Sequence, residues 1–387
     1  MRICLITSVY PLHAGDGEAA AGLFAKDLAL ELRRQGVDVT VLTQSRPGKF
    51  RDDEGIEVAR FAWSGGGRRL STLSLSRPLD ILHISTVMAM GQVALIRLLR
   101  RQRFDGMLAL WAAPAGLWAW TGHRVFGVPY FCWTLGSDIW VYGRKAMFRP
   151  LLRRALRAAA RVYADGEELR SETERIGGRD CELLPTTRIL PKDNLPPVGL
   201  RPDKVNFVFI GRFHAHKGPD LLLDAIGLIP PADLEGLHFH ILGDGELRPA
   251  LEARLAKGAY AHAVTLGGYV GAAEAAAYLA GAHALVIPSR AESIPVVLSD
   301  ALQMSCPVVV NDVGDMGALV ARYGAGLVAR RGDPQSLCAA ILEMRARPRA
   351  EFASNIGKLH ALFDLSAIAR TLIDNFRRHQ RPAPSIE

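Results

Sequence analysis

Strand-like and helix-like segments alternate along the chain, and this alternation occurs twice. Short apolar runs predict strands at 3–9, 37–42, 128–133, 161–163, 206–210, 237–242, 263–266, 284–288 and 307–311. Helical patterns lie between or after them, at 22–35, 150–159, 220–229, 246–257, 272–281, 295–304 and 334–346. Strands that alternate with helices in this way indicate βαβ units and parallel sheets.

Prolines interrupt the alternation between 187 and 202, where four of them exclude a core helix or a central strand. We therefore predict an α/β protein with two Rossmann-like, doubly wound domains that face a cleft. The first domain spans 1–196 and the second spans 197–365, and a C-terminal helix at about 366–380 packs back on the first. Ligands of such sheets bind outside the carboxyl ends of the strands, so the loops after the strands are where chemistry is expected.

Composition and charge narrow the class of protein. A chain with 49% hydrophobic and 22% charged residues is neither disordered nor fibrous. Residues 1–196 contain 28 Lys+Arg and 20 Asp+Glu, whereas residues 197–387 contain 19 of each, so the net charge of +8 lies in the first half. This asymmetry indicates an anionic partner on that side.

The cysteines and the lengths of the apolar runs indicate in which cellular compartment the protein works. Five scattered cysteines show no metal-ligand spacing and predict a reducing compartment. The N-terminal apolar run is too short for a secretory signal, and the apolar window 107–120 is too short to span a membrane. We expect a soluble, cytoplasmic protein.

The loop IGRFHAHKGPDLLLDA, residues 210–225, carries the first candidate site. A predicted strand ends at Gly211, the cations Arg212 and Lys217 follow, and Pro219 suits the first turn of a helix. Two cations beside free helix N–H groups favour an anion, with phosphate the natural ligand. An ordinary basic surface loop is the alternative.

Two further loops carry candidate ligand contacts. Gly243 and Gly245 flank Asp244 where a strand turns into a helix, which allows close approach to a ligand but also fits a plain turn. Glu292 and Asp300 stand eight positions apart in SRAESIPVVLSDALQMSCPVVV, which is otherwise almost wholly apolar. Both acids are expected to face the cleft and to accept hydrogen bonds from sugar or ribose hydroxyls. A capping glutamate and a solvent-facing aspartate are the alternative.

The helix that follows Glu292 has a predicted start. Ser293 is the expected N-cap and Pro295 the expected first helical residue.

Together these loops resemble the donor domain of family 4 glycosyltransferases, which have the GT-B fold. The motifs, in order, are G-R-F-x3-K-G, I-L-G-D-G-E-L, G-G-Y-V and P-S-R-x-E-S-I-P-x4-D-A-L-x3-C-P-V-V-V, and the resemblance covers 206–346. The first half fits more loosely, through SVYP after the first strand, the start of the first helix and T-L-G-S-D at 134–138. The resemblance implies transfer of a sugar from a nucleotide diphosphate sugar with retention of anomeric configuration and without a metal ion.

The resemblance also implies roles for single residues. Arg212 and Lys217 would stabilise the leaving diphosphate, and Glu292 would contact the sugar hydroxyls as a third catalytic residue. The implied donor-binding residues are Gly211, Gly243, Asp244, Gly245, Tyr269, Val270, Ser293, Ile294, Pro295 and Asp300. The implied acceptor-side residues are Gly22, Gly136 and Asp138, the last of which would orient the acceptor or cap the following helix.

Three positions depart from the family pattern. Asp300 replaces the second glutamate of the E-x7-E motif, which contacts the ribose; Pro295 replaces a glycine; and Leu135 replaces a histidine. These departures keep a catalytically silent GT-B scaffold as an alternative. A nucleotide-sugar 2-epimerase shares the architecture, but we would expect additional acids and histidines for proton abstraction, and the sequence does not show that set.

We expect no cofactor and no metal, a UDP- or GDP-linked hexose as co-substrate, and a glycan or lipid-linked acceptor in cell-envelope polysaccharide or glycolipid synthesis. Nucleic acid is not expected as a partner. The segments 94–103 and 144–160 combine apolar residues with arginines at helical spacing. They predict peripheral contact with the anionic inner face of the cell membrane. Core-packed helices with solvated basic faces are the alternative.

Overall fold

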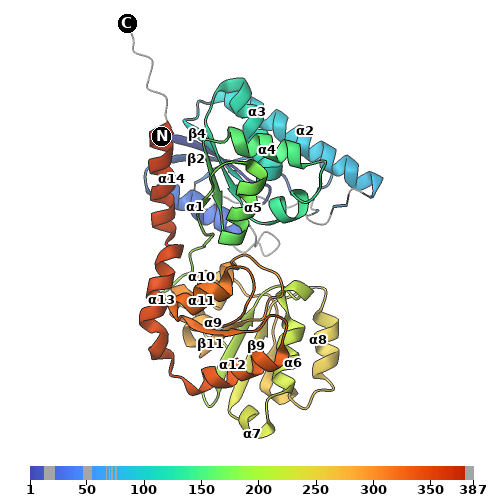
Figure 1. Cartoon of the computed structure of the whole chain (residues 1–387), viewed down its shortest axis with the longest axis vertical. Coiled ribbons are helices and arrows are strands. Elements are labelled where there is room, and N and C mark those ends of the chain that lie inside the picture. Colours follow the sequence, from blue (N-terminus) through green and yellow to red (C-terminus); the bar gives the residue numbers. More distant parts are fainter. Residues whose placement is uncertain are drawn as a thin grey trace. The chain divides into compact units, whose positions relative to one another are not determined.

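The computed structural model describes residues 1–12, 22–46, 55–66, 68, 70, 73–74 and 76–379. The chain forms two compact units: Met1–Pro185 together with the segment from Leu365 onward, and Thr186–Asp364 (Figure 1). The first boundary therefore falls at Pro185 rather than at 196. Residues beyond it belong to the second unit because they pack on its helix α10 (Val296–Gln303), where the backbone N–H of Leu190 donates to Gln303 Oε1 at 3.1 Å.

The first unit is built on a seven-stranded parallel sheet with the strand order β3-β2-β1-β4-β5-β6-β7. The order reverses between β1 and β4, as in doubly wound folds. The strands are β1 (Arg2–Ile6), β2 (Asp38–Gln44), β3 (Glu57–Phe61), β4 (Gly106–Leu110), β5 (Tyr130–Thr134), β6 (Arg161–Ala164) and β7 (Glu182–Leu183).

Alternation along β1 shows that the sheet is buried on both faces. Ile3 and Leu5 pack with helices α1 (Leu23–Arg34) and α14 (Leu365–His379), whereas Cys4 and Ile6 join the core under the other layer. Helices of the second layer are α2 (Pro78–Arg101), α3 (Leu117–Phe126), α4 (Arg149–Ala158) and α5 (Glu167–Gly177).

The C-terminal helix α14 is part of the first unit's core. The rings of Phe131 and Phe376 stack with their centroids 3.8 Å apart, and Asn375 donates a hydrogen bond to the Tyr163 hydroxyl at 2.8 Å.

Helix α2 is apolar but largely exposed, which is unusual for a helix that packs on a sheet. Among the described residues it alone is long and apolar enough to cross a membrane by length and composition, and 28% of its most apolar window is buried. The apolar window 107–120 singled out in the sequence is a different segment. One end of α2 projects past its neighbours (Figure 1). The rest of the helix packs on β2, β3 and α3.

The second unit is a six-stranded parallel sheet with the order β10-β9-β8-β11-β12-β13. Its strands are β8 (Val205–Ile210), β9 (Leu237–Leu242), β10 (Val264–Leu266), β11 (Ala284–Ile287), β12 (Val308–Asn311) and β13 (Gly326–Ala329). Its helices are α6 (Pro219–Gly227), α7 (Pro231–Leu234), α8 (Arg248–Leu255), α9 (Ala272–Gly281), α10, α11 (Met316–Tyr323), α12 (Pro334–Ala346) and α13 (Ala353–His360).

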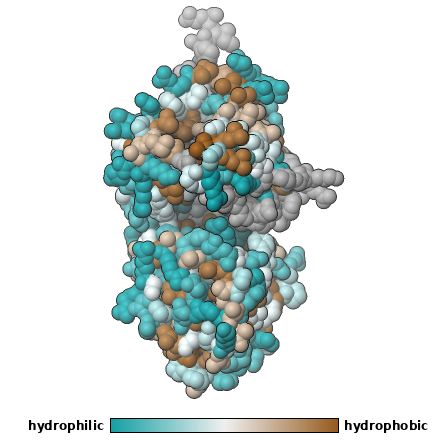
Figure 2. Space-filling model, turned by 90° about the vertical axis from the view of Figure 1, so that its right-hand side faces the viewer, coloured by the Kyte–Doolittle hydropathy of each residue, from teal (hydrophilic) through white to brown (hydrophobic). Residues whose placement is uncertain are grey.

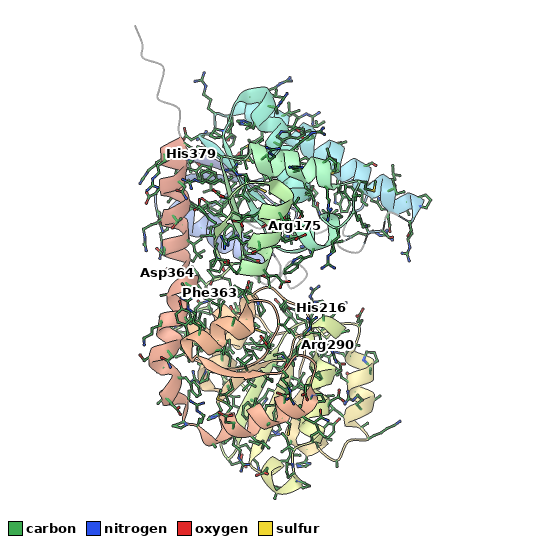
Figure 3. All side chains as sticks on the ribbon, in the orientation of Figure 1. Arg175, His216, Arg290, Phe363, Asp364 and His379 are labelled. Atoms are coloured by element: carbon green, nitrogen blue, oxygen red, sulfur yellow. The ribbon has the colours of Figure 1, made fainter. Side chains whose placement is uncertain are left out.

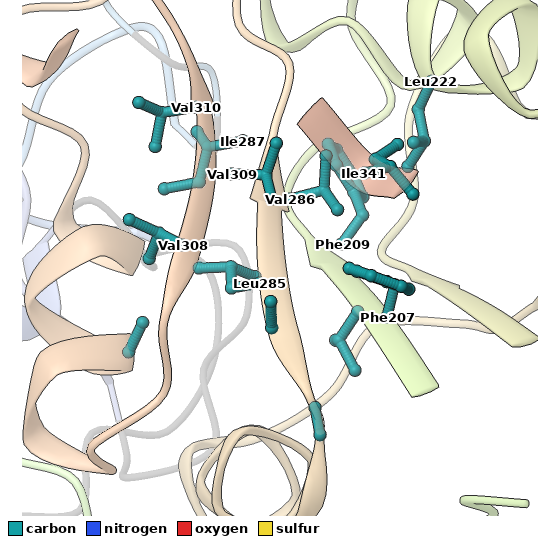
Figure 4. Packing of buried hydrophobic residues seen from close by; sticks show 14 of the residues in the cluster. Phe207, Phe209, Leu222, Leu285, Val286, Ile287, Val308, Val309, Val310 and Ile341 are labelled. Carbon is teal, nitrogen blue, oxygen red and sulfur yellow. The ribbon is translucent and has the colours of Figure 1, made fainter. Parts of the chain in front are cut away.

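The core of the second unit is almost wholly aliphatic and aromatic. Figure 4 shows Phe207 and Phe209 from β8 beside Leu285 and Val286 from β11, with Val308 on the next strand. Central strands that are buried on both faces explain why these segments read as continuous apolar runs.

Candidate functional site

The loops at the carboxyl ends of β8, β9 and β11 meet at backbone distance. Gly218 has a φ of 72°, and a Cβ there would overlap the carbonyl oxygen of Pro288. A Cβ at Gly243 would in the same way overlap the carbonyl oxygen of Gly211. Only glycine fits at these two positions. The two glycines therefore allow the backbones of the three loops to lie in contact at one edge of the sheet.

At this edge Lys217 and Glu292 form an ion pair between the β8 and β11 loops. Their side chains are 22% and 16% exposed, so the pair is accessible but largely desolvated. Arg212 lies in the same β8 loop, is exposed and forms no ion pair with any described residue. The structure thus brings two of the three predicted catalytic residues into contact and leaves the third as a free guanidinium.

A second ion pair fixes these two loops to each other. Arg290 donates to both carboxylate oxygens of Asp220, each at 2.8 Å. Its Nη1 and its backbone N–H also donate to the carbonyl oxygens of Ala215 and His216, both at 2.7 Å. Figure 3 shows His216 and Arg290 close together. Arg290 therefore holds the turn that carries Lys217 against the loop that carries Glu292.

Asp300 is buried and paired rather than open to the cleft. It is 1% exposed, and Arg188 Nε and Nη2 donate to its carboxylate at 2.9 and 2.6 Å. Because the guanidinium occupies both oxygens, the carboxylate presents no surface to a ribose hydroxyl. In this structure Asp300 binds Arg188 of the segment that enters the second unit, and its contact with a ribose stays a prediction.

The β9 loop is held by helix α8. Asp244 is exposed and accepts hydrogen bonds from Arg248 Nε and from the backbone N–H of Gly245, both at 2.8 Å. Arg248 Nη2 also donates to the carbonyl oxygen of Gly243 at 2.7 Å. Asp244 thus helps to shape the loop and keeps its remaining surface open.

The other predicted donor-binding residues differ in exposure. Tyr269 is 51% exposed. Ser293 and Ile294 are buried in the β11 loop, directly after Glu292. The helix begins one residue later than expected: Pro295 is the N-cap of α10, and Ser293 is not. Val270 is partly buried against the core.

Histidines near the site form no metal cluster. His214 Nε2 lies 3.2 Å from Glu246 Oε1, and its ring lies beside that of His216. Nowhere in the described ranges do three or more His, Cys, Asp or Glu residues gather in a group that could hold a metal ion.

In the first unit, Asp138 is buried completely. Its carboxylate accepts hydrogen bonds from the backbone N–H groups of Ala112 and Leu135, at 2.6 and 3.3 Å. Burial raises the pKa of Asp138 to about 6, although these N–H groups act in the opposite direction. In this structure Asp138 ties together the loops after β4 and β5, and its role in orienting an acceptor stays a prediction.

Backbone geometry explains why the two predicted acceptor-side positions, Gly22 and Gly136, are glycines. A Cβ at Gly22 would lie 2.6 Å from the carbonyl oxygen of Val9, and Gly136 has a φ of 107°. Trp111, between β4 and the Asp138-bound loop, has a φ of 71°, which is rare for a bulky residue.

Family profiles match both units. The profile described as "Glycosyl transferase 4-like domain" matches residues 20–186, and the one described as "Glycosyl transferases group 1" matches residues 204–346. The chain is a family 4 glycosyltransferase. A relative of the enzyme is the "Putative teichuronic acid biosynthesis glycosyltransferase TuaC" of Bacillus subtilis, 27% identical over 371 residues that cover 88% of each chain.

Solved structures show that the glycosyltransferase has the GT-B fold. Sucrose-phosphate synthase from Thermosynechococcus elongatus matches with a TM-score of 0.81 at 18% identity, over 98% of this chain and 99% of that chain. Anabaena Alr3699/HepE in complex with UDP-glucose matches with a TM-score of 0.66 at 17% identity, over 98% and 100% of the two chains.

Sequence reasoning missed two arginines of the glycosyltransferase. Arg188 lay in the predicted linker, and its partner is 112 residues away. Arg290 stood inside the quoted P-S-R motif, and its pairing with Asp220, 70 residues away, gives no local signal. The presence of an arginine within a loop motif that is otherwise small and apolar was the one available clue.

Proposed function

We propose that the protein is a retaining glycosyltransferase that moves a hexose from a nucleotide diphosphate sugar to a glycan or lipid-linked acceptor in cell-envelope polysaccharide or glycolipid synthesis. The observation that carries this proposal is the Lys217–Glu292 ion pair at the carboxyl edge of the second sheet, with Arg212 exposed in the same β8 loop. The teichuronic acid biosynthesis in the name of TuaC and the UDP-glucose in the HepE complex support the acceptor and donor classes.

The proposed mechanism follows from charge. Breaking the anomeric C–O bond builds positive charge on the sugar and negative charge on the leaving diphosphate. Fixed cations stabilise that developing negative charge, and this is the role of Arg212 and Lys217. Glu292, released from Lys217 when the diphosphate binds, accepts hydrogen bonds from sugar hydroxyls. The departing phosphate oxygen takes the proton of the acceptor hydroxyl, which attacks from the same face, so no cofactor, metal or protein base is assigned.

A binding experiment tests the donor assignment. Thermal unfolding in the presence of UDP, GDP, ADP and TDP should show one preferred nucleotide, because a ligand at 100 times its dissociation constant adds roughly 2.7 kcal/mol of stability. Lys217→Ala and Arg212→Ala should reduce the shift. The exposed Lys257 and Arg331, changed to alanine, are matched controls in the same unit and should leave it unchanged.

A second function is favoured by one observation. Arg188 pairs with Asp300, the residue from which the family pattern expects a ribose contact. A catalytically silent GT-B scaffold would tolerate the loss of that contact. No thermal shift with any of the four nucleotides would favour the scaffold.

We also propose that the protein works in the cytoplasm and touches the anionic inner face of the cell membrane through 94–103 and 144–160. The apolar positions Leu152, Ala155 and Leu156 of α4 are buried, while its arginines lie outside. The basic face is therefore available for such contact.

A further inference from the structure

An open depression lies between helices α3 and α4 on the surface of the first unit. Its volume is about 700 Å³. The residues that line it are Trp120, Thr121, Arg124, Arg154, Arg157 and Ala158. None of them belongs to the donor site or to the predicted acceptor-side residues, so the depression needs an explanation of its own.

The three arginines of the depression are not neutralised by the protein. Arg124, Arg154 and Arg157 are all exposed, and none forms an ion pair with a residue that the structure describes. By contrast, Arg161 and Arg170 of the same unit pair with Glu182 and Glu167.

The surrounding sequence contains almost no acid. Residues 106–164 hold eight Lys+Arg and one carboxylate, Asp138, which is fully buried. Helix α5, which packs on α4, carries four glutamates, and three of them pair with Arg170 and Arg175 of the same helix. The arginines of the depression therefore give it a positive potential, which attracts an anion.

The residue types indicate which anion. Guanidinium groups bind phosphate oxygens in pairs, and three of them around one depression match a group that carries more than one negative charge. A phosphate monoester carries about −1.5 to −2 at pH 7, as the second pKa near 6 implies. A phosphodiester carries one charge and has fewer free oxygens, so it satisfies fewer of the donors. Trp120 adds an indole ring, a group that favours the boundary between water and lipid.

The setting of the depression indicates a lipid source. Helices α2, α3 and α4 pack side by side in one layer, and Figure 2 shows brown apolar side chains on the surface of this unit. Exposed apolar residues of α2, α3 and α4 and the segment before α4 include Leu79 (57%), Leu82, Val125 (59%), Met147 (69%) and Leu151. Exposed apolar side chains mixed with arginines are typical of a surface that adsorbs to an anionic bilayer.

We propose that this depression is a binding site for the phosphomonoester headgroup of a membrane lipid. The proposal rests on the membrane contact proposed above and adds selectivity to it. General attraction by the basic face responds only to surface charge, whereas three arginines that line one depression distinguish a monoester from a diester.

Vesicle binding tests the site. We would compare vesicles that contain phosphatidic acid with vesicles that contain phosphatidylglycerol, with their proportions adjusted to the same zeta potential. The wild type should bind the phosphatidic acid vesicles about tenfold more tightly, which corresponds to about 1.4 kcal/mol. Combined substitution of Arg124, Arg154 and Arg157 by glutamine should bring the ratio to about one.

A matched control separates the site from general adsorption. Substitution of Arg97, Arg100 and Arg101 of α2 by glutamine removes the same charge from exposed positions of the neighbouring helix. It should weaken binding to both kinds of vesicle and keep their ratio. If the combined variant of the depression does not fold, the three single substitutions should each lower the ratio.

The outcomes distinguish the two proposals. Equal binding of the wild type to both vesicles would overturn the phosphomonoester site and leave the membrane contact standing. No binding to either would overturn both. Loss of the ratio in the α2 control would show that the depression is not its source. Displacement from phosphatidic acid vesicles by equimolar glycerol 3-phosphate would show that a soluble phosphate is the ligand and overturn the lipid assignment.

Discussion

Arg290 and Asp220 show how single side chains determine where the catalytic candidates lie. Their ion pair and the two hydrogen bonds from Arg290 to the β8 loop hold Lys217 opposite Glu292. We expect Arg290→Gln to lower kcat by about tenfold and to change nucleotide affinity little, because the loop loses its alignment rather than a ligand contact.

A double-mutant cycle checks this role for Arg290. Asp220→Asn should reduce kcat by a similar factor, and the double variant should be no worse than either single variant. Losses that simply multiply would contradict the positioning role.

The buried pair of Asp300 with Arg188 should contribute to stability. Removing one partner of a buried ion pair leaves the other charge uncompensated, so Asp300→Ala should lower the free energy of unfolding by about 3–5 kcal/mol. Urea unfolding measures this value. If the variant instead kept its stability and lost nucleotide affinity, Asp300 would be a ribose ligand after all, and Arg188 would be incidental.

At the scale of elements, Asp138 couples the loops after β4 and β5 and makes their stability depend on pH. Because burial raises its pKa to about 6, the folded protein holds this proton more tightly than the unfolded chain does. Its contribution to stability is therefore full below pH 4 and falls as the pH rises through 6, by up to about 3 kcal/mol.

Asp138→Asn tests this contribution, because asparagine does not titrate. The difference in unfolding free energy between variant and wild type should shift in favour of the variant between pH 4 and pH 6.5. A difference that stays constant over this range would show that Asp138 is ionised in the folded state throughout.

Elements also show what the sequence can and cannot predict. The second unit's helices at 272–281 and 334–346 were predicted to the residue, because their apolar periodicity is clean and Gly or Pro marks their ends. In contrast, β4 and α3 merged into one apolar window, since a buried parallel strand and a buried helix are both apolar throughout.

The candidate site was predictable to a similar degree. Lys217, Arg212 and Glu292 stand in motifs, so the sequence marks them. The engagement of Asp300 by Arg188 depends on packing between residues far apart in the chain, and neither periodicity nor spacing carries that information.

For the whole molecule, the uneven charge makes membrane contact depend on salt. Residues 1–196 carry the net charge of +8, and about 0.5 M salt shortens the Debye length to a few Å. We expect vesicles with anionic lipid to bind the protein at low salt and to release it at about 0.5 M. Changing Arg149, Arg153 and Arg157 to glutamate should release it at low salt as well, with nucleotide binding unchanged. A wild type that ignores anionic vesicles at low salt would favour a soluble acceptor.

Slow hydrolysis of a donor without acceptor tests whether cations of the second unit drive departure of a nucleoside diphosphate. UDP-glucose and GDP-mannose would be incubated with the wild type, with Lys217→Ala and Arg212→Ala, and with the Lys257→Ala and Arg331→Ala controls, and release of UDP or GDP would be measured. We predict turnover of one donor that falls on the order of 10²–10³-fold in each site variant and is unchanged in the controls. Wild-type release that persists undiminished in Lys217→Ala and Arg212→Ala would contradict the account.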